Sequence, residues 1–152
     1  MSHHYSEALM GFRNILKYYD SLRRRVCKQH GLSQTEFDVL AFLGNNPGLD
    51  TARDIVELRM LPKSNVSIAV EALIRRGLLC RRQDTGDRRR IHLSLTPSAA
   101  PLLQDVLGVM PAFAGDALSG FSEEEIQAFA GFYQRIAQNI SLCLQKEGTF
   151  HE

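Results

Sequence analysis

The sequence lacks tryptophan, contains only three cysteines, and has no apolar run long enough to span a membrane. A membrane-spanning helix needs about 20 consecutive apolar residues, so we expect no membrane partner. Cys27, Cys80 and Cys143 are odd in number and far apart, which argues against a disulfide framework or a C-x-x-C zinc site. We expect each to be a small buried residue. The first residues also lack the basic-then-apolar layout of a signal peptide, which predicts a cytoplasmic protein.

The 152 residues carry a net charge of only +1, but the charge is unevenly distributed. Residues 51–96 contain ten basic and five acidic residues, whereas residues 97–152 contain two and seven. With 44% hydrophobic and 23% charged residues, the chain has the composition of a folded domain rather than of a disordered one. The basic middle would attract a polyanion. An unevenly charged, solvated surface is the alternative that charge alone leaves open.

Apolar residues recur every three or four positions in six segments, which predicts six helices. The first helix runs from Tyr5 to about Cys27, and His30-Gly31 ends it. The signals that begin the later helices are, in order, the Ser33–Glu36 capping box, Asp50 or Thr51, Pro62 in a first turn, Thr96-Pro97-Ser98, and the Ser122–Glu125 capping box. Pro111 is expected to kink the fifth helix.

Between the fourth and fifth helices the period of the pattern changes to that of β-strands. Leu78–Arg82 and Arg90–Leu95 are predicted strands, and the polar turn Gln83–Arg89 between them contains a glycine. The result is a β-hairpin with a cationic tip. Helices followed by such a hairpin are typical of a winged helix-turn-helix. The predicted fold class is mainly α with a small β-hairpin (α+β), with additional helices at both ends.

The fourth helix and the hairpin tip carry side chains that suit duplex DNA. The second helix of a helix-turn-helix enters the major groove, where Ser and Asn can bond base edges and an aliphatic group can touch a thymine methyl. A lysine at a helix N-terminus suits a phosphate, and arginine is favoured in narrow minor grooves. The candidate DNA-binding residues are Lys63, Ser64, Asn65, Ser67, Ile68, Asp87, Arg88, Arg89 and Arg90. Asp87 is interpreted as the carboxylate that holds a neighbouring guanidinium group. The alternative is a solvated hairpin with local ion pairs.

The first and last predicted helices both carry an apolar stripe. In the last helix the stripe steps by three and four residues for nearly three heptads, which is typical of a helix that pairs with another helix. The candidate dimerisation residues are Leu9, Phe12, Leu16, Ile126, Phe129, Tyr133, Ile136 and Ile140. A second copy of the chain is the expected partner for this apolar surface. Packing of the last helix on the core of its own chain is the alternative.

Several of these residues carry a resemblance to a known family. Asp87, Arg89, Leu93, Leu95 and Thr96 fit the wing signature D-x-R-x-x-x-L-x-L-T of the multiple-antibiotic-resistance regulator (MarR) family. Asn65-Val66-Ser67 and Leu73 resemble the recognition helix of this family, and Arg76-Gly77-Leu78-Leu79 resembles the turn into its wing. The start of its second helix is similar to Leu32-Ser33 followed by Val39-Leu40. The resemblance covers essentially the whole chain. Two positions depart from it: Ile68 stands where a basic residue is common, and Ala99-Ala100-Pro101 where a glycine is usual.

The resemblance implies a cytoplasmic, prokaryotic transcription regulator, more often a repressor than an activator, that binds a palindromic operator as a homodimer. It assigns residues 31–96 to DNA binding and residues 1–30 with 97–152 to dimerisation, in one compact chain. It also implies that Arg89 enters the minor groove and that Asp87 orients it.

Two kinds of signal would regulate such a protein. Members of the family often bind small phenolic or aromatic anions between the dimerisation helices and the DNA-binding region, and the candidate effector residues here are Tyr19, Arg23, His30 and Phe113. The alternative is a thiol-based redox sensor of the same fold. Cys27 follows three arginines and precedes Lys28, a setting expected to lower its pKa.

An enzyme and a protein-interaction module are the two other classes of function to compare with DNA binding. We expect no enzyme, because the chain has no glycine-rich phosphate loop, H-E-x-x-H motif or nucleophile elbow. No cofactor or metal is expected, since the five histidines are scattered. A helical protein-interaction module without DNA binding is the other alternative. The expected partners are therefore double-stranded DNA, a second copy of the chain, and a small-molecule effector.

Overall fold

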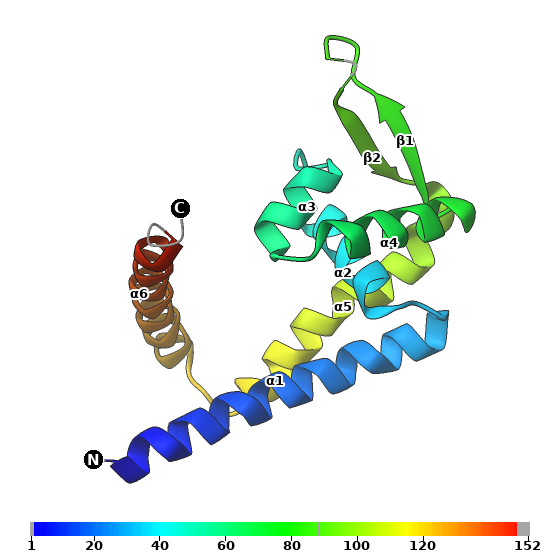
Figure 1. Cartoon of the computed structure of the whole chain (residues 1–152). Helices are drawn as coiled ribbons and strands as arrows, with labels where there is room; N and C mark the ends of the chain where they lie inside the picture. Colours follow the sequence, from blue (N-terminus) through cyan, green and yellow to red (C-terminus); the bar gives the residue numbers. More distant parts are fainter. Residues whose placement is uncertain (1, 88, 149–152) are drawn as a thin grey trace. The chain divides into compact units, whose positions relative to one another are not determined.

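The computed structural model describes the backbone of residues 2–87 and 89–148 and the side chains of residues 10–87 and 89–145. It is mainly helical with one two-stranded antiparallel sheet, as predicted (Figure 1). The elements in order are α1 (Ser2–His30), α2 (Gln34–Asn45), α3 (Ala52–Arg59), α4 (Lys63–Arg75), β1 (Leu79–Gln83), β2 (Ile91–Leu95), a 3₁₀ turn (Pro97–Ala99), α5 (Ala100–Ala117) and α6 (Glu123–Gly148). Among the described residues, no helix combines the length and apolar character that crossing a membrane requires.

The chain divides into two compact units, Met1–Ala114 and Gly115–Glu152. The first contains the core, to which α1, α2, α4, the hairpin and α5 contribute buried side chains. The second consists mainly of α6. The assignment of residues 31–96 to DNA binding and of the flanking helices to dimerisation stays a prediction.

The core is centred on α2. Its N-terminus is the predicted capping box: the Ser33 hydroxyl accepts the Glu36 N–H, and the Glu36 carboxylate accepts the Ser33 N–H. Such a box satisfies two N–H groups that the helix cannot bond internally. The helix is buried on more than one side, because Val39 and Phe42 are buried in addition to Phe37 and Leu40.

The helix-turn-helix consists of α3, a three-residue turn and α4. Thr51 and Asp54 form a second capping box at the start of α3, which the sequence reading missed. The turn passes through Met60, whose φ of 52° lies in the left-handed region. Pro62 is the residue before α4 rather than part of its first turn, a shift of one position from the prediction. At the other end, Gly77 adopts the positive φ that the predicted helix stop requires.

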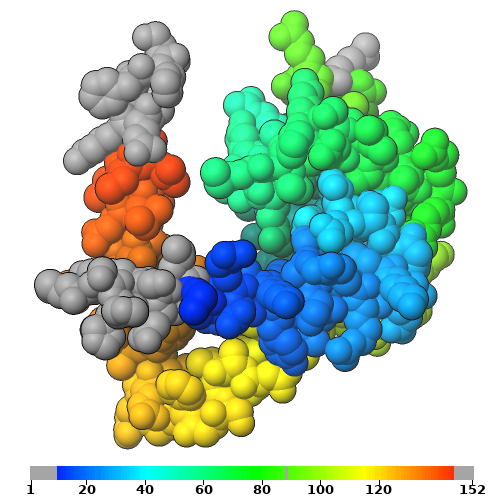
Figure 2. Space-filling view, turned by 60° about the horizontal axis from the view of Figure 1, so that its bottom comes forward, coloured from blue at the N-terminus to red at the C-terminus, as the bar shows by residue number. Residues whose placement is uncertain are grey.

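The predicted hairpin is present, and each of its strands is shifted by about one residue. Leu79 pairs with Leu95 and Gln83 with Ile91 in an antiparallel register. The buried side chains of Leu79 and Leu93 attach the base of the hairpin to the core. Most other residues of both strands are exposed, and the tip of the hairpin projects beyond the helices of the first unit (Figures 1 and 2).

The entry into α5 is settled by the 3₁₀ turn, which begins after Thr96 and buries Ala99 completely. The Thr96 hydroxyl donates to the Gly77 carbonyl at 2.6 Å, so the end of the hairpin is also bonded to the end of α4. The helix continues through Pro111 to Ala117. Its buried residues are Leu102, Val106 and Val109, whereas Met110 is exposed.

Candidate nucleic-acid interface

One face of α4 is exposed and chemically varied. Val66, Ala69, Val70 and Leu73 are buried against the core, which directs the other side of the helix outward. All five residues predicted to contact DNA from this helix are exposed: Lys63, Ser64, Asn65, Ser67 and Ile68. We call them the exposed face of α4. The N–H groups of its first turn receive no side-chain cap, so they are available to a phosphate.

The hairpin tip, residues 84–87 and 89–90, is held in shape by two carboxylates. The Asp84 carboxylate accepts the N–H groups of Gly86 and Asp87 at 2.7 and 2.8 Å. The Asp87 carboxylate accepts the Arg89 N–H at 3.0 Å. Aspartate commonly organises turns through such bonds to following N–H groups. The tip is therefore an ordered turn that presents arginines, not a loose loop.

The Asp87 carboxylate accepts the backbone N–H of Arg89, because the N–H two residues on lies within reach of a short aspartate side chain. The predicted role of Asp87 as the partner of a neighbouring guanidinium group stays a prediction. Arg88 of the predicted set lies outside the described residues.

Exposed cations remain at the tip. Arg89 and Arg90 are exposed, and among the described residues they form no ion pair with a carboxylate. Two other arginines of the basic segment are already paired. Arg81 of β1 pairs with Glu71 of α4, and Arg76 donates to the carbonyls of His30 and Gly31 at the end of α1. Among the described residues, the hairpin cations without a carboxylate partner are therefore Arg82 of β1 and the two tip residues Arg89 and Arg90.

His92 is a residue of this region that the sequence reading did not single out. Its ring lies between two carboxylates, with Nδ1 2.6 Å from Asp50 and Nε2 2.9 Å from Asp84. Asp50 is 42 residues away in the sequence, so no local sequence pattern predicts its contact with His92.

The predicted dimerisation residues are mostly exposed in the single chain. In α1, Phe12 and Leu16 are 57% and 66% exposed, and the side chain of Leu9 lies outside the described residues. In α6, Phe129, Tyr133, Ile136 and Ile140 are each more than half exposed, and Ile126 is half-buried. Apolar surface of this extent is typical of an interaction site.

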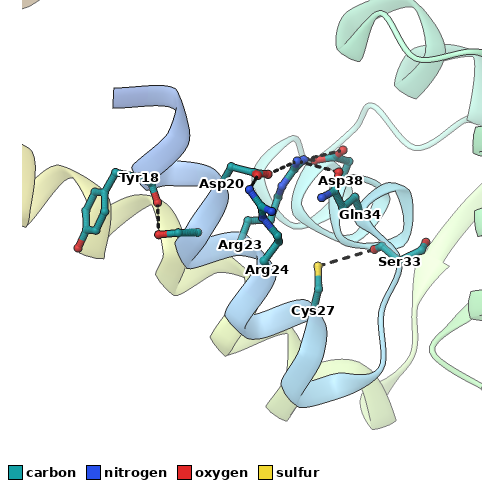
Figure 3. A network of polar contacts seen from close by, with 9 residues as sticks. Tyr18, Asp20, Arg23, Arg24, Cys27, Ser33, Gln34 and Asp38 are labelled. Atoms are coloured by element: carbon teal, nitrogen blue, oxygen red, sulfur yellow. Dashed lines mark hydrogen bonds and ion pairs between the residues drawn. The ribbon is translucent and has the colours of Figure 1, made fainter. Parts of the chain in front are cut away.

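The four predicted effector residues fall into separate contacts. Tyr19 packs edge-to-face on Phe113, with ring centroids 5.6 Å apart. Arg23 instead reaches from α1 to Asp38 and Gln34 of α2, and it also bonds Asp20 (Figure 3). His30 contacts Asp105 of α5 at 2.7 Å. Both cationic candidates thus face carboxylates of the same chain, and binding of an effector by this set stays a prediction.

The environment of Cys27 contradicts the expectation of a lowered pKa. Its side chain is buried, and its Sγ faces the Ser33 carbonyl at 3.8 Å (Figure 3). Burial raises the pKa of the thiol, because removal from water disfavours the thiolate; this outweighs the lowering by Arg23. Cys80 and Cys143 are exposed, so the prediction of three buried cysteines is right only for Cys27.

This difference predicts the order in which the thiols react. We expect Cys27 to be alkylated by iodoacetamide more slowly than Cys80 at neutral pH, because Cys27 combines low exposure with a raised pKa. Mass spectrometry of timed samples measures the rates, and the unfolded protein provides the control in which they converge. If Cys27 reacts first in the folded protein, this account of its environment is wrong.

The fold and the exposed cations together define a winged helix-turn-helix DNA-binding protein. The family model described as "MarR family" matches residues 30–90. Two bacterial relatives are similar over most of the chain. The "HTH-type transcriptional regulator PecS" of Dickeya dadantii is 30% identical over 118 residues, covering 76% of this chain and 71% of its own. The "uncharacterized HTH-type transcriptional regulator YkoM" of Bacillus subtilis is 32% identical over 101 residues, covering 66% and 65%.

The similarity extends to solved structures. A transcriptional regulator of the MarR family from Silicibacter pomeroyi has 26% identity and a TM-score of 0.74, with 90% of each chain covered. The chain belongs to the MarR family of transcription regulators, as the wing residues indicated.

Proposed function

We propose that this regulator binds a palindromic operator as a homodimer and acts as a repressor. In each protomer the exposed face of α4 would enter the major groove, and the hairpin tip would place Arg89 in the adjacent minor groove. The flanking helices α1 and α6 would join the two copies. The proposal contains no catalytic step.

One observation carries the proposal: a helix face rich in small polar groups and a hairpin tip with exposed arginines belong to the same compact unit. Serine and asparagine suit base edges, and Ile68 suits a thymine methyl. The arginines suit the negative potential of a narrow minor groove. The choice of repression over activation follows from the family resemblance alone.

A solved protein of this fold supports the choice of ligand. MepR of Staphylococcus aureus, at 21% identity and a TM-score of 0.58, has been solved as a mutant bound to an oligodeoxyribonucleotide. The homodimer is supported by the exposed apolar residues of α1 and α6, which a single chain leaves in water.

The salt dependence of binding separates this proposal from a helical interaction module. We expect the affinity for duplex DNA to fall with rising salt, with a log–log slope near −0.9 for each phosphate contact. Fluorescence anisotropy with a labelled duplex at several salt concentrations measures the slope. Absence of duplex binding even at low salt would contradict the proposal and favour the interaction module.

A further inference from the structure

His92 lies at the base of the hairpin tip, on the side of β2 away from the core. Its neighbour Leu93 is buried, and because successive side chains of a strand point to opposite faces, His92 faces outward. The His92 side chain is nevertheless only 15% exposed, because Asp50 and Asp84 cover its two ring nitrogens. We call these three residues the His92 bridge.

The chemistry of the bridge matches a charged histidine. Ionised carboxylates only accept hydrogen bonds, and a neutral imidazole has one donor and one acceptor nitrogen. Only the imidazolium ion donates at both Nδ1 and Nε2, as two carboxylates at 2.6 and 2.9 Å require. Hydrogen bonds to Asp84 and Asp50 raise the pKa of His92 accordingly. The bond from His92, with the N–H groups of Asp87 and Gly86, lowers the pKa of Asp84 well below its usual range.

The bridge connects the helices to the arginine-bearing turn. Asp50 lies just before α3, and its carbonyl also accepts the Leu93 N–H at 2.7 Å. Asp84 uses one carboxylate oxygen for His92 and the other for the N–H groups that shape the tip. Thus one side chain joins the segment before the helix-turn-helix to the turn that places Arg89 and Arg90.

We propose that His92 is a positioning residue for DNA binding: by donating to Asp50 and Asp84 at once, it fixes the hairpin tip, and with it Arg89 and Arg90, relative to α3 and α4. The inference rests on the proposed function, because it assumes that the tip contacts DNA. It predicts that the tip is held firmly only while His92 is protonated.

Other charged groups near the bridge do not offset it. Arg82 lies opposite His92 in the strand register and Arg90 lies two residues before it, but the two largest effects on the pKa of His92 come from its hydrogen bonds to Asp84 and Asp50. Several charged residues of the neighbouring elements pair elsewhere: Arg81 with Glu71, Arg53 with Glu57, Asp54 with Thr51, Glu36 with Ser33 and Arg76, and Asp38 with Arg23. The two carboxylates at hydrogen-bond distance therefore dominate.

The direction of the pH effect follows from the shifted pKa values of His92 and Asp84. The pKa of His92 is raised above 6.5, so its contribution is complete below that value and is lost as pH rises through the raised pKa. The pKa of Asp84 is lowered from 3.8, so its contribution is complete above that value and is lost only as pH falls through the lowered pKa. The bridge is therefore intact at mildly acidic pH and weakens as pH rises through the raised pKa of His92.

The first part of the test needs no DNA. NMR titration of the ring proton of His92 in the free full-length protein should give a pKa above 6.5, and Asp50→Asn should bring it closer to that value. A pKa at or below 6.5 in the unsubstituted protein would overturn the inference.

The second part measures DNA affinity at constant ionic strength, with a duplex recovered from a random-sequence pool. From about pH 6 to about pH 9 we expect affinity to fall by roughly tenfold, because loss of the His92 proton releases the hairpin tip. His92→Gln and Asp50→Asn should both bind weakly and with little pH dependence. His30→Gln, which alters another histidine beside a carboxylate, should retain the pH dependence.

Each outcome separates the inference from the proposed function. If His92→Gln weakens binding but Asp50→Asn behaves like the unsubstituted protein, His92 acts on DNA directly, and its positioning role is overturned. If both variants retain full affinity and pH dependence, the positioning role is likewise overturned while DNA binding stands. If Arg89→Ala binds as well as the unsubstituted protein, the wing contact of the proposed function fails, and the NMR titration still tests the bridge.

Discussion

Ile136→Glu is expected to convert the proposed dimer into a monomer and to lower operator affinity by about 10²- to 10⁴-fold, the range that a second linked binding site contributes. Ile136 lies in the apolar stripe of α6 and is 55% exposed in the single chain. In a two-fold interface the substitution enters twice, so two carboxylates would be transferred from water into an apolar contact. Light scattering coupled to gel filtration measures the mass, and anisotropy measures the affinity.

Gln138→Glu is the matched control for this experiment. It adds the same charge to the same helix, but Gln138 is exposed and lies on the opposite side of α6 from the stripe. We expect this variant to remain dimeric and to bind DNA normally. If Ile136→Glu also remains dimeric, the stripe of α6 is not the interface.

Arg89→Ala is expected to weaken operator binding by more than ~1 kcal/mol. Arg89 is exposed at the hairpin tip, and the Asp87 carboxylate fixes its backbone N–H. Its guanidinium has no carboxylate partner among the described residues, so little is lost within the protein when it is removed. The slope of affinity against salt should also become shallower by about one contact.

Arg25→Ala serves as the control for Arg89→Ala, because Arg25 is an exposed arginine of α1 outside the surface proposed to contact DNA. We expect its affinity to match that of the unsubstituted protein. Equal affinity of the Arg89→Ala variant and the unsubstituted protein would remove the wing from the mechanism of DNA binding.

The features that could be predicted from the sequence depend on residues close together in the chain. The capping boxes at Ser33 and Ser122 were predicted because their partners lie three residues on, and both are present. The hairpin was predicted from the change of period and a glycine-containing turn. The exposed face of α4 followed from the spacing of its buried residues, which leaves the other side of a helix outward.

The features that were missed depend on contacts between distant segments. The His92 bridge joins residues 42 and 8 positions apart, and no periodicity specifies such a contact. Cys27 was judged by its basic neighbours in the sequence, whereas its pKa is dominated by burial. The pairing of Arg81 with Glu71 likewise depends on how β1 meets α4, which no local pattern specifies.

Selection of bound fragments from a pool of random duplexes tests the central claim most directly. If two copies of the chain each place α4 in a major groove and Arg89 in a minor groove, the recovered fragments should share a palindrome. Its half-sites should lie one helical turn, about 10 base pairs, apart on one face of the DNA. Recovery of fragments without a shared sequence, or of a single half-site with no symmetric copy, would contradict the account.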